Sequence, residues 1–364
     1  MIEIKPGQVK KKLFFRSGIC GYLVDIEDRE EKAICYPALV GSVEPGDKVL
    51  LNTTAVSLEL GTGGYHYIIA NLSGTGKDAE GGGHIMKMRY TPQQIKVMSV
   101  EEEESPYHKQ MAAADSLDNI PVIVCSLHSM LAPLCLYLAQ ERIRPAYVMT
   151  DGGALPLVFS QAVDWLKQQQ LLAGTVTVGH AFGGDLEAVN IFSGLLAAKV
   201  VFVPDVIIVA MGPGIVGTGT RWGFSGVEQG QVIDAVNALN GRSVAVPRIS
   251  FADPRERHKG ISHHTLTVLS RVCHTEAILP IPWLEDRSKM GFLQKQLADH
   301  NLLNAHQCCV EDGHRIIPLI KSSELKMTTM GRGIDEDQEF FLTLGAAAAT
   351  VIKLINKQGL SRLV

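Results

Sequence analysis

Hydrophobic and polar positions follow two different patterns of spacing, one before about Val100 and another in the rest of the chain. Up to about Val100, short runs rich in β-branched and aromatic residues are separated by turn sequences such as EPGD and GTGG. Glycine and proline in these breaks favour tight turns. Short strands at this spacing are typical of a small β-barrel or sandwich. The predicted strands are QVKKKLFFR (8–16), ICGYLVDIE (19–27), KAICYPALV (32–40), DKVLLNTTAV (47–56), YHYIIANL (65–72), GHIMKMRY (83–90) and QQIKVMSV (93–100).

An acidic run follows this β region. The sequence EEEESPYH at 101–108 combines consecutive glutamates with a proline, which is typical of a solvated linker. We therefore expect an all-β barrel-like domain over residues 1–100 and an acidic linker over 101–118. The remainder, 119–364, has a different pattern.

In this remainder, short apolar runs alternate with longer amphipathic segments. The expected helices are 130–143, 155–170, 185–199 and 228–241, with a final helix within 333–359. Near-continuous apolar strands alternating with helices indicate a parallel sheet covered on both faces. The fold class is therefore α/β, with a doubly wound, Rossmann-like domain over 119–364 after the β domain. The expected strands are IPVIVC (120–125), PAYVMT (145–150), GTVTVGH (174–180), PDVIIVAM (204–211), SVAVPRI (243–249), EAILPIP (276–282) and AHQCCVE (305–311).

Composition narrows the class of protein further. The chain has 46% hydrophobic and 20% charged residues, and its 34 basic and 38 acidic residues give a formal net charge of -4. This balance gives little reason to expect nucleic acid as a partner. One alternative is a nucleic-acid-binding module, because KKKLFFR (Lys10–Arg16) interleaves basic and aromatic residues as single-strand-binding barrels do.

Three features of the sequence bear on the cellular location of the protein: its N-terminal residues, its apolar runs and its cysteines. The N-terminal residues do not resemble a signal peptide, and no apolar run is long enough and unbroken enough for a membrane span. The seven cysteines contain no C-x-x-C pattern. We expect a cytoplasmic protein with no membrane partner and with reduced, buried thiols. Assembly into a homo-oligomer stays open.

Polar residues gather in the loops that follow the predicted strands of the α/β domain. In open parallel sheets these loops form the ligand crevice at one edge. The loops that return from helix to strand look generic by comparison, so we place the functional site at the carboxyl edge. The loops in question are Ser126–Ser129, Thr150–Gly153, Gly179–Asp185, Gly212–Gly226 and Arg248–His264.

The fourth of these loops tests a dinucleotide-binding interpretation. Gly212, Gly214 and Gly217 match G-x-G-x-x-G, but further glycines follow and the next helix begins only near Glu228. A dinucleotide fingerprint requires the helix to start within the motif. The next predicted strand, 243–249, carries Arg248 near its end instead of the acid that binds the ribose of NAD. An arginine in this place would suit only NADP, which has a 2'-phosphate. A nucleophile elbow at GFSG is another weak alternative.

We instead interpret the loop as an arch whose backbone amides bind an anion. An ordinary packing loop is an equal alternative. The predicted anion-binding residues are Gly212, Gly214, Gly217, Thr218, Gly219 and Arg221 in this loop, Arg255 and Arg257 in the next, and Asp151.

The densest group of chemically active residues is FADPRERHKGISHH (251–264). We predict that Arg255 or Arg257 clamps an anion. With a helix beginning near Gly260, adjacent His263 and His264 would diverge, so that only one faces the crevice. A solvated connection with one buried histidine is the alternative. The predicted catalytic residues are His180, Asp253, His258 and His263.

A metal ion is a further alternative to metal-free chemistry. No H-x-H or H-E-x-x-H signature is present, so we predict no metal. If one is bound, its predicted ligands are His128, Asp151, His180 and His258. We expect Asp185 to cap the helix that follows it rather than to bind ligand. The cofactor stays unknown.

Four long motifs resemble a bacterial family known as domain of unknown function 3866. They are GDKVLLNTTAVSLELGTGGYH, GHAFGGDLEAVN, MGPGIVGTGTRWGFSG and PRISFADPRERHKGISHHT, and the similarity covers nearly the whole chain. The resemblance implies a bacterial cytoplasmic origin and nothing about the substrate. The residues themselves favour an enzyme acting on a small anionic metabolite, with phosphorylated metabolites as one option. The alternative is a non-catalytic metabolite sensor or scaffold.

Overall fold

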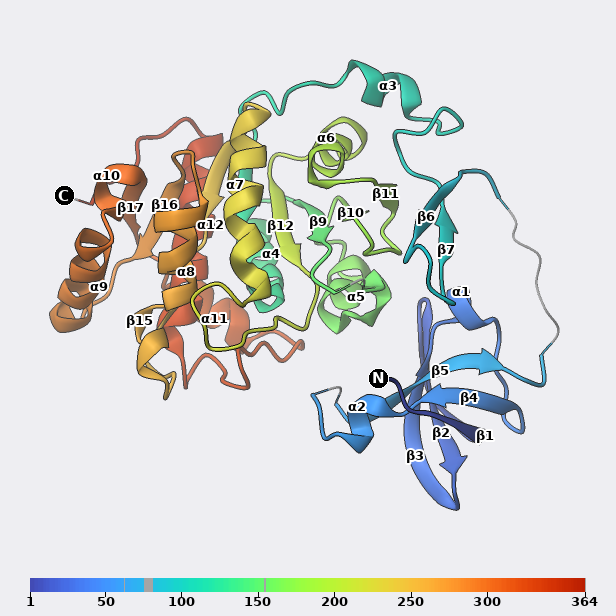
Figure 1. The fold of residues 1–364 in the computed structure, drawn as a ribbon. Helices are drawn as coiled ribbons and strands as arrows, with labels where there is room; N and C mark the ends of the chain where they lie inside the picture. Colours follow the sequence, from blue (N-terminus) through green and yellow to red (C-terminus); the bar gives the residue numbers. More distant parts are fainter. Residues whose placement is uncertain (62, 75–80, 154, 364) are drawn as a thin grey trace. The chain divides into compact units, whose positions relative to one another are not determined.

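A computed structural model describes residues 1–61, 63–74, 81–153 and 155–363. The chain divides into two compact units, Met1–Val97 and Met98–Val364 (Figure 1). The first is built of strands and the second of alternating strands and helices. Each unit has its own hydrophobic core.

The first unit is a small closed barrel. Its strands are β1 (Ile4–Arg16), β2 (Ile19–Ile26), β3 (Arg29–Cys35), β4 (Lys48–Asn52) and β5 (Tyr65–Asn71), in the order β1-β2-β3-β5-β4. Only the β3–β5 pairing is parallel. Closure leaves every strand paired on both sides, which removes exposed sheet edges. The barrel predicted from the sequence is therefore confirmed.

Two of the predicted strands in this unit extend too far. Residues 37–40 form the short helix α1 (Pro37–Val40), because Pro37 at its first position lacks the N–H that a strand ladder needs. Residues 54–57 likewise form helix α2 (Thr54–Ser57). The last two strands, β6 (Ile85–Lys87) and β7 (Ile95–Val97), pair with each other outside the barrel.

The second unit contains an eight-stranded sheet in the order β11-β10-β9-β12-β8-β13-β16-β17. All neighbouring pairs are parallel. This confirms the Rossmann-like prediction. The strands are β8 (Pro121–Val124), β9 (Ala146–Thr150), β10 (Gly174–Val178), β11 (Leu186–Ala188), β12 (Ile207–Met211), β13 (Arg242–Ala245), β16 (Ile278–Pro282) and β17 (Gln307–Glu311).

Helices cover both faces of this sheet because the strand side chains alternate between two cores. Ile123 of β8 contributes to one core, and its neighbours Val122 and Val124 contribute to the other. The first face carries α4 (Leu131–Ala139), α5 (Gln161–Gln168), α11 (Ile316–Lys321) and α12 (Gln338–Ile355). The second carries α6 (Ile191–Phe202), α7 (Glu228–Ala238), α8 (His263–Thr267), α9 (Arg287–Asp299) and α10 (Leu302–Ala305) (Figure 1).

Helix α12 is long and apolar enough, by length and composition, to cross a membrane. Most of it is nevertheless buried inside the protein, and Phe341, Leu344 and Ala348 belong to the core under the first face. Its apolar character is that of a core helix packed against a sheet.

Two segments differ from the sequence-based expectation. Residues 108–113 of the predicted acidic linker form helix α3 (His108–Ala113), and Met111 is buried in the second core. The helix expected from Asp185 begins only at Ile191, where Asn190 caps it. Asp185 does not cap this helix, because its carboxylate accepts hydrogen bonds from the backbone N–H and hydroxyl of Thr175 and pairs with Lys167.

The connections around β8 create a crevice. The chain leaves β8 toward α4 on the first face, whereas it leaves the neighbouring strands β12 and β13 toward α7 and α8 on the second face. Loops that depart to opposite faces separate at the carboxyl edge of a sheet and leave a cavity between them. The switch point of the sheet, where neighbouring strands connect to opposite faces, therefore lies on both sides of β8, between β12 and β8 and between β8 and β13.

Candidate functional site

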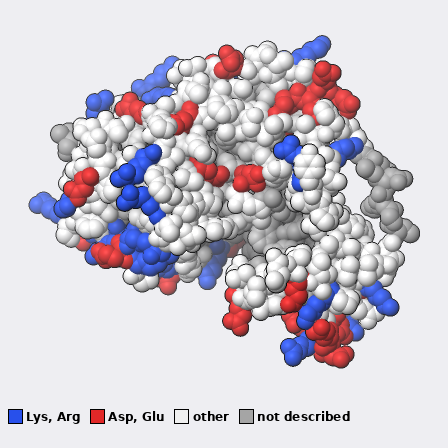
Figure 2. Space-filling view, in the orientation of Figure 1, with Lys and Arg blue, Asp and Glu red and all other residues white. Residues whose placement is uncertain are grey.

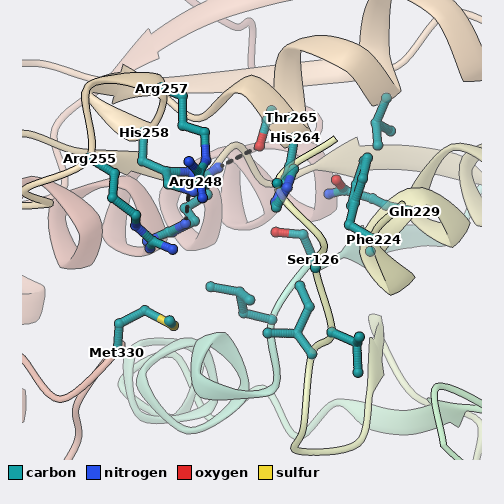
Figure 3. Close-up of a pocket in the computed structure, with 17 residues that line it drawn as sticks. Ser126, Phe224, Gln229, Arg248, Arg255, Arg257, His258, His264, Thr265 and Met330 are labelled. Carbon is teal, nitrogen blue, oxygen red and sulfur yellow. Dashed lines mark hydrogen bonds between the residues drawn. The ribbon is translucent and has the colours of Figure 1, made fainter. Parts of the chain in front are cut away.

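A cavity of about 200 Å³ lies at this switch point (Figure 3). Loops following β8, β12 and β13 supply most of its walls, and the segment before α12 adds Met330. This position is where open α/β sheets bind ligands. The lining residues are Ser126, Leu127, Ile215, Val216, Gly217, Gly219, Phe224, Gly226, Gln229, Arg248, Arg255, Arg257, His258, His264, Thr265, Val268 and Met330.

The glycine-rich loop after β12 forms part of the apolar wall. Gly217 pairs with Phe224 across the loop, and Phe224 is buried. A short 3-10 turn, Ser225–Val227, leads into α7 at Glu228. The helix therefore begins well beyond the glycine motif, as expected for a loop that is not a dinucleotide fingerprint.

Only part of the predicted anion-binding arch lines the cavity. Gly217 and Gly219 lie in its wall, whereas Gly212, Gly214, Thr218 and Arg221 are not among the lining residues. The Thr218 hydroxyl is already engaged within the loop, with the hydroxyl of Thr220 and the backbone carbonyl of Gly223.

A small hairpin holds the next loop in place. Strands β14 (Ile249–Ser250) and β15 (Gly260–Ile261) pair antiparallel and bring the two ends of residues 251–259 together. Gly260 has φ +67, and a Cβ atom there would lie 2.4 Å from Oε1 of Gln296. Only glycine fits this backbone conformation without strain. Gln296 also accepts a hydrogen bond from the N–H of Ile261.

Asp253 organises the basic residues of this loop. Its side chain is fully buried, and it accepts two hydrogen bonds from Arg255, each 2.9 Å long. Buried Arg248 donates a third, with its NH2 2.8 Å from Oδ2. These hydrogen bonds, above all those from Arg255, hold the pKa of Asp253 well below its ordinary value. The carboxylate is therefore charged and fixes two guanidinium groups at the cavity.

A second carboxylate extends this network toward α12. Arg332 contacts Asp253 at 3.5 Å and donates to Asp337, with Nε 3.0 Å from Oδ2. Asp337 also accepts from the hydroxyl of Ser250, at 2.8 Å. Burial raises the pKa of Asp337. The segment before α12 is thus tied to the β14 hairpin by ionic contacts.

Three histidines form a cluster beside the arginines. The ring centroids of His263 and His264 are 4.1 Å apart, and those of His258 lie 4.9 and 5.2 Å from them. Of the adjacent pair only His264 lines the cavity, in line with the expectation that one of the two faces the crevice. Helix α8 begins at His263 and not near Gly260, so both rings project from its first turn toward His258.

All three rings are held in the neutral form. Burial, aided by the positive charge of Arg248, lowers the pKa of His258 to about 3. Burial lowers the pKa of His264 to about 4 and lowers that of His263 as well. At neutral pH each ring is therefore neutral and carries one nitrogen lone pair, whereas an efficient general base has a pKa nearer 7.

Several polar atoms at the cavity have no hydrogen-bond partner within the part of the chain that the structure describes. They include Oγ of Ser126, Oε1 of Gln229 and Nε of Arg248, all buried. Figure 3 shows the Ser126 hydroxyl directed from the β8 loop toward the side that holds Arg248 and His264. Buried polar groups are normally paired, so unpaired ones at a cavity wall indicate a missing polar partner.

The remaining predicted site residues lie elsewhere. Oδ2 of Asp151 accepts from the backbone N–H of His180 at 2.8 Å, and neither residue lines the cavity. His128 has both ring nitrogens engaged, Nε2 with Oγ of Ser160 at 2.6 Å and Nδ1 with the carbonyl of Met211 at 3.2 Å. Desolvation lowers the pKa of His128 to about 4. These contacts hold the ring of His128 in place away from the cavity lining.

The predicted metal ligands His128, Asp151, His180 and His258 do not form one cluster. Among the described residues, the group of metal-binding side chains that comes together is His258, His263 and His264. His264, Arg248, Ser126, Gln229 and Met330 were not among the predicted site residues. A signal for two of them exists in the sequence, since Arg248 lies near the end of the predicted strand 243–249 and His264 adjoins His263.

The fold and the cavity together define a Rossmann-like α/β protein with a basic, histidine-lined pocket at the switch point of its sheet. The family described as Protein of unknown function (DUF3866) matches residues 32–348, so the chain belongs to this family. The match includes the eight-stranded sheet, the cavity and the loop after β13 that supplies its charged residues. No curated protein and no solved structure matches the chain.

Proposed function

We propose that the protein is an enzyme acting on a small anionic metabolite, with a phosphate or carboxylate group, bound in the pocket at the switch point. The observation that carries this proposal is the charge of the lining: among the residues that the structure describes, it contains Arg248, Arg255 and Arg257 and no carboxylate. Asp253 behind the wall neutralises only part of this charge. An excess of positive charge in a concave site favours an anion.

The three arginines differ in what they offer a ligand. Arg248 and Arg255 are held in place by Asp253. Arg255 uses Nε and NH2 for this contact, and its side chain is 40% exposed, so NH1 can reach a ligand. Arg257 is exposed and has no ion-pair partner among the residues described. A fixed guanidinium beside a free one suits planar, bidentate recognition of an oxyanion.

The apolar lining residues of the cavity suit an apolar part of the ligand. Ile215, Val216 and Phe224 from the β12 loop face the site together with Leu127 and Met330. Apolar walls with a few fixed polar groups are usual in small-molecule sites. Figure 2 shows Lys and Arg side chains gathered over the part of the second unit that contains β15 and α8, which would attract an anion to this side.

Thermal unfolding in the presence of anions tests the proposal. Sulfate, inorganic phosphate and a panel of phosphorylated and carboxylated metabolites are added to metal-free protein. A ligand at 100 times its Kd stabilises the folded state by about 2.7 kcal/mol. We expect stabilisation by at least one anion in the wild type, a smaller effect in Arg257→Gln, and an unchanged effect in the control Arg287→Gln, an exposed arginine on α9.

Stabilisation by no anion, or equal stabilisation of all three proteins, would overturn the proposed binding site. Conversion of the bound metabolite is then followed by phosphorus and proton NMR. Binding without conversion would leave a metabolite sensor, the other class that the sequence allows.

A further inference from the structure

We propose that His258, His263 and His264 bind a divalent transition-metal ion of the zinc type at the inner side of the pocket. This inference goes beyond anion binding and does not depend on it. The three side chains each offer one ring nitrogen, and these atoms all lie within 4.8 Å of one another. Three imidazoles with a further position open to solvent or ligand form a typical catalytic zinc site.

The burial of the donor atoms supports this assignment. His258 is buried, and Nε2 of His263 is buried without any hydrogen-bond partner among the described residues. An imidazole nitrogen in such a place normally finds a donor, an acceptor or a metal. His258 and His264 also line the cavity, which gives an ion held between the rings access to a ligand.

Neighbouring groups fix the orientation of two rings. Oγ of Ser262 lies 2.7 Å from Nδ1 of His258, which suits an Nδ1–H donor and leaves Nε2 as the metal ligand. The ring of His264 stacks on Phe224, with centroids 4.0 Å apart and planes at 9°. Such outer contacts hold ligating imidazoles in position.

Arg248 competes for the same nitrogen of His258. Its NH1 lies 3.1 Å from Nδ1, and a hydrogen bond there requires the proton on Nε2. Metal binding selects the other tautomer, in which Nδ1–H donates to Ser262. Arg248 then keeps its contact with Asp253 through NH2, which is 2.8 Å from the carboxylate. The metal therefore costs one hydrogen bond and leaves the Asp253 ion pair intact.

Three neutral imidazoles bring no negative charge to balance the ion. The nearby charges are Arg248, Arg255 and Arg257, of which the first two pair with buried Asp253. The open coordination position should therefore prefer an anion over water, because an anion reduces the repulsion between metal and guanidinium groups. This coupling, unlike the metal site itself, rests on the proposed function.

Metal binding to the full-length chain provides the test. Protein stripped with chelator is titrated with Zn²⁺ by calorimetry, and with Co²⁺ by visible absorption, in chloride and again in sulfate. We expect one ion per chain, a tetrahedral Co²⁺ spectrum, and tighter binding in sulfate. His263→Asn should weaken binding by more than about 100-fold, because even the loss of an outer-shell partner costs about 10–100-fold.

The matched control is His300→Asn, an exposed histidine at the end of α9. It should bind Zn²⁺ like the wild type. The absence of stoichiometric binding in both salts, or equal affinities of the wild type, His263→Asn and His300→Asn, would overturn the metal site. Equal Zn²⁺ affinity in chloride and sulfate would overturn only the coupling to the anion.

Discussion

The guanidinium of Arg255 donates two hydrogen bonds, each 2.9 Å long, to the carboxylate of Asp253. Buried Arg248 donates a third to the same carboxylate. One carboxylate thus sets the position of two of the three arginines that line the pocket. The pocket depends on Asp253 for its geometry as well as for its charge balance.

Asp253→Ala should therefore destabilise the protein strongly. It leaves the buried Arg248 without a counterion, and the loss of one partner of a buried pair costs about 3–5 kcal/mol. Chemical denaturation measures this change in the free energy of unfolding. Asp299→Ala is the control, since its ion pair with Lys295 is exposed and worth less than about 1 kcal/mol. Similar small losses in both variants would contradict a central role for Asp253.

The β14–β15 hairpin gives a second prediction. Gly260→Ala places a methyl group 2.4 Å from Gln296 and 2.7 Å from the ring of Phe292, at φ +67. The backbone conformation alone costs about 1–2 kcal/mol. We expect a lower unfolding temperature. We also expect weaker anion binding, because the loop 251–259, which carries Arg255 and Arg257, would shift.

Gly291→Ala is the matched control. This glycine lies in α9, and apart from its own helix backbone and chain neighbours no described atom would lie within 4 Å of the added methyl group. Alanine should therefore raise the stability of the protein by about 0.4–1 kcal/mol. If both alanine variants melt at the same temperature, the tight fit at Gly260 is not significant.

His128 predicts a dependence of stability on pH. Desolvation lowers its pKa from an ordinary value of 6.5 to about 4, so the folded state takes up a proton less readily than the unfolded chain. Its contribution is complete above pH 6.5 and is lost as the pH falls from there toward 4. His128→Gln removes this titration, and the difference in unfolding free energy between wild type and variant should shrink between pH 7 and pH 5. A constant difference would show that His128 titrates normally.

Much of the fold follows from pattern. The apolar strand runs and the glycine and proline breaks identify a barrel and a parallel sheet, because the burial of alternate or continuous apolar positions is a local property of the sequence. The predicted ends of strands and helices are wrong where a single residue changes the backbone conformation, as Pro37 does. They are also wrong where a side chain binds a partner distant in the sequence. Asp185 bonds to Thr175 across the β10–β11 turn, which its helix-capping sequence context does not reveal.

The sequence predicts which loops form the candidate site, but not which of their side chains come together. The edge of the sheet and the arginines of the basic loop follow from the position of strand ends, but which side chains meet depends on three-dimensional convergence. His263 and His264 both come close to His258 in the structure, in which α8 begins at His263. Met330 comes from a segment with no strand-end signal.

The most direct test of the central claim is a crystal structure of the protein soaked with selenate, an oxyanion that anomalous scattering locates. The account predicts selenate in the pocket at the switch point, with oxygens within hydrogen-bond distance of Arg255 and Arg257. Selenate bound only elsewhere, with the pocket filled by water at saturating concentration, would contradict it.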